Sequence, residues 1–252
     1  MTGDQYVASI INKYALFSRP PTSTSAAQAV ARILQSWAGR HLLEITYSGS
    51  GAKGTAIRGI ADVDLFISLA PQTPGTLADI YSNLINYRPL SPFRPRRQNV
   101  SIGITYNQVK MDLVPARKQA GNTTDHSLYK TKVRSWIQTN VAEHIRLIQN
   151  SQRLPEIRAL KIWKALHRLE FPSFYLELTT LDALSGKRAV SVADNVLSAL
   201  DYLATRFPSA VVVDPANSNN RISDDLTPAE KNAIALKAAG CRRATNWEQI
   251  LW

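Results

Sequence analysis

The 252-residue sequence contains a single cysteine, Cys241, and four histidines. One cysteine excludes an internal disulfide, and the histidines do not have the spacing of zinc ligands. No apolar run approaches the roughly 18 residues that would suggest a membrane-spanning helix. Residues 1–5 lack the charged and apolar segments of a secretory signal peptide. These absences predict a cytoplasmic protein that does not associate with membranes.

Acidic residues are scarce relative to basic ones. There are 30 lysines and arginines against 19 aspartates and glutamates, a formal net charge of +11. Such an excess indicates an anionic partner, with RNA or DNA as candidates, or a strong attraction for nucleotides. Two groups of basic residues are the candidate phosphate contacts, although a solubilising surface is an open alternative: Arg88, Arg94, Arg96 and Arg97 in a proline-containing loop, and Lys130, Lys132 and Arg134 close to Trp136.

Residues 49–64 join a Gly-Ser turn, Gly49-Ser50, to two aspartates spaced one residue apart at the start of an apolar strand. Side chains alternate across a strand, so Asp62 and Asp64 are expected on the same face. At roughly 5 Å, two ionised carboxylates repel each other by about 3 kcal/mol at an effective dielectric near 20. Oxygen ligands of this kind favour Mg²⁺ or Mn²⁺, which completes its shell with water and substrate phosphates. The segment therefore predicts metal-dependent chemistry on a nucleoside triphosphate.

Other interpretations of the glycines in this segment are weaker. Residues 49–54 form a literal G-x-G-x-x-G, but a dinucleotide-binding unit needs a crossover helix next and an acid about 20 residues on. Here Gly59 interrupts and the acids come too soon. A Walker A loop fails because Lys53 is followed by Gly54 and not by Ser or Thr. A surface turn with solvated acids ranks below the metal interpretation.

A third acid, Asp112, lies inside another apolar strand. Residues 100–106 and 109–114 read as two strands around an Asn107-Gln108 turn, with Pro115 expected to end the second. An aspartate in such a strand is costly to desolvate unless it is paired or bound to a metal. An acid facing water on an edge strand is the secondary alternative.

The remaining patterns predict an α+β protein with a mixed sheet and flanking helices, followed by a helical lobe. Helices are expected at 4–15, 24–38 and around 75–86, and strands between 43 and 114. Ser23 or Thr24 would cap the second helix after a linker at 17–23. From Asp125 the chain is expected to be helical. This gives a palm lobe at 1–118 and a helical lobe at 119–252, with a nucleotide cleft between them.

Gly49-Ser50, Asp62-x-Asp64 and Asp112 together resemble the three-carboxylate signature of the polymerase β-type nucleotidyltransferases. The branch with the most similar motifs contains 2'-5' oligoadenylate synthases, class I CCA-adding enzymes and bacterial cGAS/DncV-like nucleotidyltransferases (CD-NTases). Residues 158–164, 171–177 and 213–220 resemble the helical-lobe motifs of that branch. The resemblance extends over about residues 26–252 and implies the bilobal nucleotidyltransferase fold.

The resemblance also implies an activity and a set of site residues. Asp62, Asp64 and Asp112 would be both the catalytic residues and the metal ligands, and Gly49 and Ser50 would hold the outer phosphates. Lys161 and Ser173 match residues that contact the triphosphate in the cyclic GMP-AMP synthase branch. Phe174 or Tyr175 matches an aromatic that stacks on the base, with core packing as an equal alternative for this pair. The alternative to a phosphate contact for Lys161 is a solvated lysine on a helix face.

The sequence leaves three functions open, of which two are enzymatic and differ in the acceptor hydroxyl and one is not enzymatic. A short linear or cyclic oligonucleotide messenger, as made in antiphage defence, is favoured by residues 171–175 and the chain length. Transfer to an RNA 3' end is favoured by the charge, but CCA-adding enzymes generally carry further domains for tRNA. A degenerate nucleotidyltransferase that only binds nucleic acid is disfavoured because all three acids are present.

Overall fold

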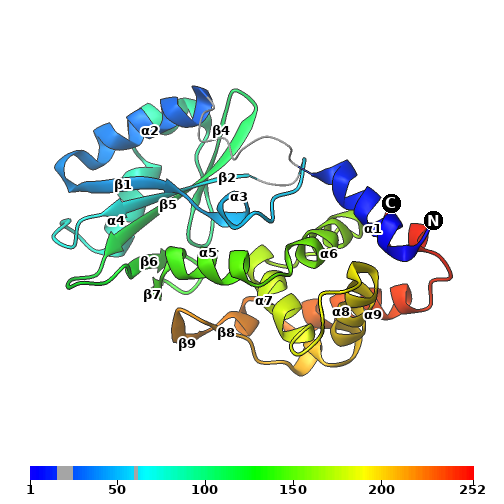
Figure 1. The fold of residues 1–252 in the computed structure, drawn as a ribbon. Helices are drawn as coiled ribbons and strands as arrows, with labels where there is room; N and C mark the ends of the chain where they lie inside the picture. The colour runs from blue at the N-terminus through cyan, green and yellow to red at the C-terminus, as the bar shows by residue number, and fades with distance from the viewer. Residues whose placement is uncertain (16–24, 60–61) are drawn as a thin grey trace. The chain divides into compact units, whose positions relative to one another are not determined.

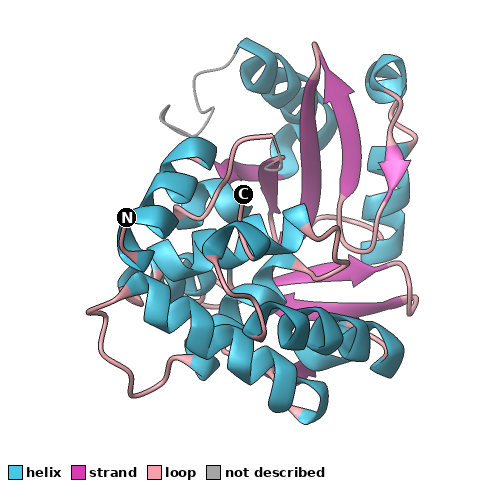
Figure 2. Cartoon of the chain, turned by 90° about the vertical axis from the view of Figure 1, so that its right-hand side faces the viewer, coloured by secondary structure: helices cyan, strands magenta, loops and turns pink. Residues whose placement is uncertain are grey.

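The computed structural model describes residues 1–15, 25–59 and 62–252, which divide into two compact units (Figure 1). The sheet unit contains residues 25–53 and 62–145. The helical unit contains residues 1–15, 54–59 and 146–252. Helices, cyan in Figure 2, make up most of the helical unit, whereas the strands, magenta, belong to the sheet unit apart from one short pair. The expected linker at 17–23 and the caps Ser23 and Thr24 lie outside the described residues.

The sheet unit is built on a mixed sheet, which has seven strands within the described residues. The strand order is β1-β2-β5-β4-β3, and β6 pairs with both β5 and β7. Strands β2 and β5 are parallel, and the other neighbours are antiparallel. The strands are β1 (Leu42–Tyr47), β2 (Val63–Leu69), β3 (Arg96–Arg97), β4 (Ile102–Tyr106), β5 (Val109–Lys118), β6 (His126–Lys130) and β7 (Ser135–Thr139). The helices are α2 (Ser25–Ala38), α3 (Gly49–Lys53) and α4 (Leu77–Ile85), with α5 (Val141–Asn150) divided between the two units.

One face of this sheet is covered by α2 and α4. The odd-numbered residues of β2 are buried in the same core as Leu34 of α2 and Leu84 of α4, both fully buried. Leu113 of β5 lies in that core too. Because strand side chains alternate, the even-numbered residues of β2 and β5 lie on the opposite face. The hydrophobic pattern therefore places Asp64 and Asp112 away from the packed helices.

The predicted hairpin around Asn107 and Gln108 is confirmed. Tyr106 pairs with Val109, and the two turn residues have φ angles of 46° and 66°. Positive φ at both positions is the geometry of a tight type I′ turn, whose twist matches that of the flanking strands.

The prediction that Pro115 ends its strand is wrong, because β5 continues to Lys118. Pro115 pairs in register with Ile67 of β2. Pairing of β5 with β4 stops at Leu113 and pairing with β6 starts at Arg117, so Pro115 has a neighbouring strand on one side only. A strand tolerates the missing N–H of proline in that situation.

The prediction that the chain is helical from Asp125 is also wrong, because a hairpin, β6–β7, comes first. Its strands pair from His126 with Thr139 to Lys130 with Ser135. Helix α5 begins only at Val141. The hairpin extends the sheet through the pairing of β6 with the end of β5, a long-range contact that local sequence patterns do not reveal.

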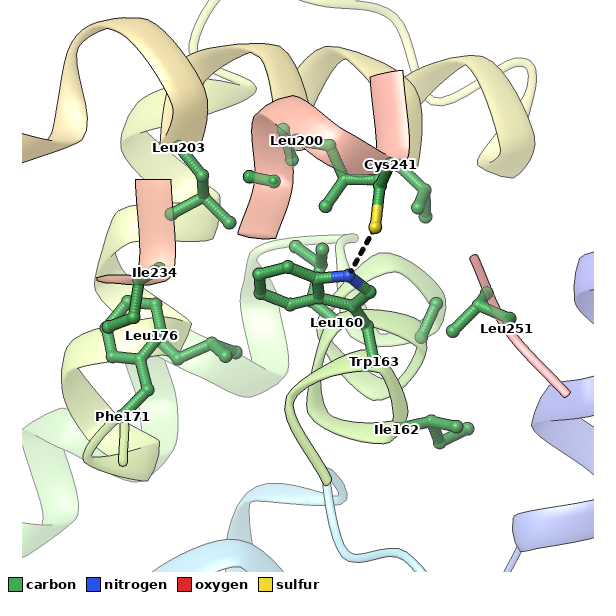
Figure 3. Packing of buried hydrophobic residues seen from close by; sticks show 14 of the residues in the cluster. Leu160, Ile162, Trp163, Phe171, Leu176, Leu200, Leu203, Ile234, Cys241 and Leu251 are labelled. Atoms are coloured by element: carbon green, nitrogen blue, oxygen red, sulfur yellow. Dashed lines mark hydrogen bonds between the residues drawn. The ribbon is translucent and has the colours of Figure 1, made fainter. Parts of the chain in front are cut away.

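The helical unit packs around Trp163, which is fully buried. Figure 3 shows its indole ring among Leu200 and Leu203 of α8 and Cys241 of α9, with the ring nitrogen donating a hydrogen bond of 3.2 Å to the Cys241 sulfur. The predicted role of Cys241 as a packing residue is confirmed. The elements are α1 (Gly3–Tyr14), α6 (Leu154–Leu166), α7 (Ser173–Ala183), α8 (Val192–Thr205), α9 (Pro228–Arg242) and the short pair β8 (Val213–Asp214) and β9 (Asn217–Arg221).

These units do not follow the expected boundary at residue 118. Helix α1 belongs to the helical unit, as do residues 54–59, which join it through a bridge between Ala15 and Ile57. The hairpin β6–β7 belongs to the sheet unit. Over the described residues, none of the helices combines the length and apolar character needed to cross a membrane.

Removing the central indole should destabilise the helical unit strongly. We expect Trp163→Ala to lower the free energy of unfolding by about 3–5 kcal/mol, because it leaves a cavity in a close-packed core. Urea unfolding followed by circular dichroism measures this change. The matched control is Trp136→Ala, which truncates a side chain that is 60% exposed and should change stability by less than about 0.5 kcal/mol. Equal effects of the two substitutions would contradict this description of the core.

Candidate active site

A row of four residues crosses the open face of the sheet, one from each of four adjacent strands. Asp64 of β2 pairs with Asp112 of β5, Asp112 pairs with Gly103 of β4, and Gly103 pairs with Arg96 of β3. Residues paired in register project from the same face of a sheet. The row therefore brings two aspartates and one arginine to the same face of the sheet. Gly103, which has no side chain, lies between Asp112 and Arg96.

The third predicted acid, Asp62, lies just before β2 and is exposed. Burial raises the pKa of the Asp112 carboxyl above its usual range, and the negative charge of Asp62 raises it further. Hydrogen bonds from Gln98 and Ser101, and the positive charge of Arg96, act in the opposite direction. The sheet unit thus pairs Asp64 in register with Asp112, and the charge of Asp62 acts on the Asp112 carboxyl.

Asp112 is held in place by two side chains that the sequence patterns did not identify. Gln98 Nε2 donates a hydrogen bond of 3.0 Å to Asp112 Oδ1. Ser101 Oγ bonds to Gln98 Oε1 and lies 3.5 Å from Asp112 Oδ2. Tyr81 connects this group to α4, since its hydroxyl donates to the carbonyl oxygens of Gln98 and Ser101. A polar residue between two strands carries no sequence signal of such a role, so only tertiary structure reveals it.

Gly49 lies directly against the carboxylate of Asp64. A Cβ atom at position 49 would come within 1.6 Å of Asp64 Oδ2, and the backbone has a φ angle of +60°. Only glycine combines that angle with so close an approach. The main chain of Asp64 is fixed as well, because its carbonyl oxygen accepts a hydrogen bond of 3.0 Å from Ser48 N. Gly49 and the half-buried Ser50 open the short helix α3, so the predicted Gly-Ser turn lies beside the acids.

The carboxylates of this site suit a hard divalent cation. Across residues 1–15, 25–59 and 62–252, no three acidic, histidine or cysteine side chains already converge as a metal-binding group. Mg²⁺ does not need such a set, because it usually takes water and substrate phosphates as further ligands beside one or two carboxylates. Two in-register carboxylates with a third nearby therefore fit Mg²⁺ or Mn²⁺ bound together with a nucleotide.

The two basic groups predicted to contact nucleic acid lie in different parts of the sheet unit. Arg88 and Arg94 lie at the start and end of a 3₁₀ segment, and Arg96 and Arg97 form β3. The positive charge of Arg96 lowers the pKa of Asp112. The Arg97 guanidinium lies 5.3 Å from the centre of the Tyr81 ring. The residues of the second group, Lys130, Lys132 and Arg134, lie on the β6–β7 hairpin.

Lys161, predicted to contact the triphosphate, lies in a buried network of the helical unit. Its Nζ donates a hydrogen bond of 2.7 Å to Thr55 Oγ1 and forms an ion pair of 2.5 Å with Glu177 Oε1. All three residues are almost completely buried. The alternative of a solvated lysine is therefore wrong, because residues 54–59 and α7 enclose a position that helical periodicity alone would expose. The phosphate contact of Lys161 stays a prediction.

The other helical-unit predictions divide between surface and core. Ser173 is exposed at the first position of α7, and Phe174 is partly buried. Tyr175 is fully buried, with its ring 5.3 Å from the rings of both Phe171 and Phe207. Base stacking by Tyr175 is therefore excluded in this arrangement, and the core-packing alternative holds for it. Base stacking by Phe174 and the phosphate contact of Ser173 stay predictions.

Comparison with solved structures identifies the fold. A chain of the Escherichia coli MS115-1 CdnC:HORMA-deltaN complex matches with a TM-score of 0.76 over 98% of this chain and 96% of that chain, at 18% identity. The Bradyrhizobium diazoefficiens CD-NTase CdnG, solved with GTP, matches with a TM-score of 0.77 over 96% and 90% of the two chains, at 14% identity. The chain therefore has the same fold as these two structures. The fold expected from the sequence is thus confirmed.

More distant and sequence-based matches agree with this fold. The Cid1 poly(U) polymerase matches with a TM-score of 0.62 over 97% of this chain and 94% of its own, at 12% identity. Among curated proteins, the cyclic AMP-AMP-AMP synthase of Escherichia coli (strain MS 115-1) is 24% identical in an alignment of 155 residues that covers 56% of this chain. The match spans about half the length of that relative, 48%. No family model matches the chain.

Substituting Gly49 should disrupt the candidate site without unfolding the protein. In Gly49→Ala the new methyl group would displace the Asp64 carboxylate, so we expect a loss of nucleotide binding in the presence of Mg²⁺. Calorimetric titration with a non-hydrolysable ATP analogue measures the loss. Gly39→Ala is the matched control, because Gly39 also has a positive φ, +51°, but nothing lies within 4 Å of a Cβ there. If the two variants bind equally well, contact between Gly49 and Asp64 is not required.

Removing the charge of Asp112 should stabilise the protein when no metal is bound. The folded protein binds a proton on Asp112 more tightly than the unfolded chain. The stability contribution of Asp112 therefore falls as the pH rises from the usual aspartate pKa towards the raised value. At neutral pH, we expect Asp112→Asn to raise the melting temperature by about 2–4 °C, or roughly 1 kcal/mol.

Thermal unfolding in EDTA measures this effect, and Asp79→Asn is the control with the opposite sign. Hydrogen bonds from the side chain and backbone of Thr76 hold the pKa of Asp79 below its usual range. Removing that charge should not raise the melting temperature at neutral pH. A lower melting temperature for Asp112→Asn would contradict the electrostatic description of the site.

Proposed function

We propose that this protein transfers a nucleoside monophosphate from a nucleoside triphosphate to a ribose hydroxyl and releases pyrophosphate. The observation that carries the proposal is the register pairing of Asp64 with Asp112 on the open face of a nucleotidyltransferase fold. The backbone of Gly49 packed against Asp64 supports it. The proposal makes Asp62, Asp64 and Asp112 the catalytic residues and the ligands of Mg²⁺ or Mn²⁺.

Each residue of the site has a distinct task in this mechanism. Asp62 and Asp64 would hold one cation next to the triphosphate. Together with Asp112, which is oriented by Gln98 and Ser101, they would hold a second cation next to the acceptor hydroxyl. A bound cation would neutralise phosphate charge and lower the pKa of the acceptor hydroxyl. Arg96, at the end of the row, adds positive charge on the same face.

The reaction balances without any oxidant or further reactant. The acceptor oxygen forms a bond to the α-phosphorus, the bond from the α-phosphorus to the bridging oxygen breaks, and pyrophosphate leaves with that electron pair. The proton of the hydroxyl goes to solvent. The site supplies orientation and charge stabilisation, which are the main requirements of phosphoryl transfer.

Residues of the helical unit would complete the nucleotide contacts. Ser173 is exposed at the N-terminal end of α7, where main-chain N–H groups and the helix dipole favour a phosphate. The proposal also assigns Lys161 a contact with the triphosphate. This contact requires the ion pair between Lys161 and Glu177 to rearrange. Phe174 is the remaining candidate for stacking on a base, because Tyr175 is buried in the core.

We further propose that the product is a short oligonucleotide messenger, linear or cyclic, used in defence against phage. Support comes from the similarity to a cyclic AMP-AMP-AMP synthase and to the CD-NTase CdnG. Addition of nucleotides to an RNA 3' end is the second candidate, and the fold match to the Cid1 poly(U) polymerase favours it.

Incubation with the four nucleoside triphosphates and Mg²⁺ tests the reaction, with and without added RNA. We expect pyrophosphate release in the wild-type protein and at least a ~100-fold loss in both Asp62→Asn and Asp64→Asn, because each loses a charge that stabilises the transferring phosphate. Chromatography of the products separates new small oligonucleotides from lengthened RNA.

The control for these variants is Asp201→Asn, the same chemical change at a half-exposed residue of the helical unit that pairs with Arg242. It should release pyrophosphate at the wild-type rate. Unchanged circular dichroism spectra would show that the inactive variants are folded. Full activity of folded Asp64→Asn would rule out the proposed reaction centre.

A further inference from the structure

A second site of the sheet unit lies at the other end of β5 from the catalytic carboxylates. It is a cavity of about 510 Å³ between the start of α4 and the β6–β7 hairpin. The lining residues used below are Thr76, Arg117, Tyr129, Arg134 and Trp136. This volume lies within the range of small-molecule sites, about 300–1,000 Å³.

The cavity is separate from the nucleotidyltransferase site. Arg117 comes five residues after Asp112 on β5, about 16 Å along an extended strand. Their residue numbers differ by five, and an odd difference along a strand places two side chains on opposite faces of the sheet. Asp112 faces the open side, whereas Arg117 lies on the side of α4. A ligand in this cavity would therefore not occupy the site of the acids.

Aromatic residues form one wall of the cavity. Tyr129 and Trp136 pair directly across the hairpin, so both project from the same face. Tyr129 is held from behind by Tyr81, with ring centres 5.9 Å apart in an edge-on arrangement. Trp136 is 60% exposed. An indole left this exposed beside a cavity offers a flat surface on which a planar group can stack.

The charges around the cavity are positive. Arg117 Nη1 donates hydrogen bonds to the carbonyl oxygens of Thr73 (3.2 Å) and Gly75 (2.9 Å), which fix the guanidinium at the wall. Arg134, on the β6–β7 hairpin, also lines the cavity. Asp79 accepts hydrogen bonds from Thr76 N and Thr76 Oγ1, at 2.8 and 2.7 Å, and is not itself among the lining residues. An anionic group would meet two arginines here.

The hairpin turn extends this positive surface beyond the cavity. Lys130 ends β6 and Lys132 follows in the exposed turn, next to Val133, which is 62% exposed. These two lysines are not among the residues that line the cavity. A strand of several nucleotides would place further phosphates along them, and aromatic stacking combined with a basic track is the usual way in which proteins bind single-stranded nucleic acids.

We propose that this cavity binds one nucleotide of a single-stranded nucleic acid, with its base stacked on Trp136 and its phosphates facing Arg117 and Arg134. A duplex offers no unstacked base to the indole, so the site should select single strands. The inference is independent of the proposed catalysis, since it uses none of the acids.

Binding of a fluorescently labelled 12-nucleotide RNA, followed by anisotropy in EDTA, tests the proposal with the catalytic site free of metal. We expect Trp136→Ala to weaken binding about 5- to 150-fold. Trp136→Tyr, which keeps an aromatic ring at this position, should retain most of the wild-type affinity. Arg134→Ala should weaken binding and reduce the slope of log K against log salt by about 0.7. Arg243→Ala is the matched control, since it removes one exposed positive charge from the helical unit.

Three further measurements distinguish the ligand. Unlabelled single-stranded RNA should compete, whereas duplex RNA and free ATP should compete much less well. Equal competition by duplex, or stronger competition by ATP than by the strand, would overturn the assignment to a single strand. If Trp136→Ala binds like the wild type while Arg243→Ala weakens binding as much as Arg134→Ala, the interaction is non-specific charge attraction and the proposed site is wrong.

Discussion

Two carboxylates face each other across neighbouring parallel strands, and the arrangement of the sheet unit depends on keeping them there. Asp64 and Asp112 are in register, on strands that are about 4.8 Å apart. Hydrophobic residues on the other face anchor β2 and β5 to α2 and α4, so a slip of one residue would bury both acids. Core packing thus holds the Asp112 carboxyl in a position where burial and the negative charge of Asp62 disfavour its ionised form. Such a local conflict is typical of functional sites.

Much of this site follows from sequence patterns, and the parts that do not are tertiary. Alternation along a strand singled out Asp62 and Asp64, and the cost of desolvating an acid in an apolar strand singled out Asp112. The resemblance to nucleotidyltransferases assigned a role to Gly49. Gln98 and Ser101 escaped prediction because their partner is on another strand. Arg96 was predicted as a basic loop residue, but strand pairing brings it to the row of acids. The β6–β7 hairpin was missed because its pairing with β5 lies far along the chain.

Lys161 and Tyr175 show the same limit in the helical unit. Both positions match motifs of nucleotide-binding residues, yet the first lies in a buried ion pair and the second in an aromatic core. Residues 54–59, which follow the glycine turn in the chain, supply Thr55 to that buried network. Helical periodicity predicts which side of α6 is apolar, but it does not reveal what a distant segment places over the polar side. Of these predicted nucleotide contacts near the start of α7, Ser173 is exposed and Tyr175 is buried.

The central claim is that Asp62, Asp64 and Asp112 hold a metal and a nucleoside triphosphate on the open face of the sheet. A crystal structure of the full chain with Mg²⁺ and a non-hydrolysable ATP analogue tests this claim most directly. The account predicts cation density in contact with Asp64 and the triphosphate next to Gly49. Nucleotide density away from the three acids, with no cation at Asp64 or Asp112, would contradict it.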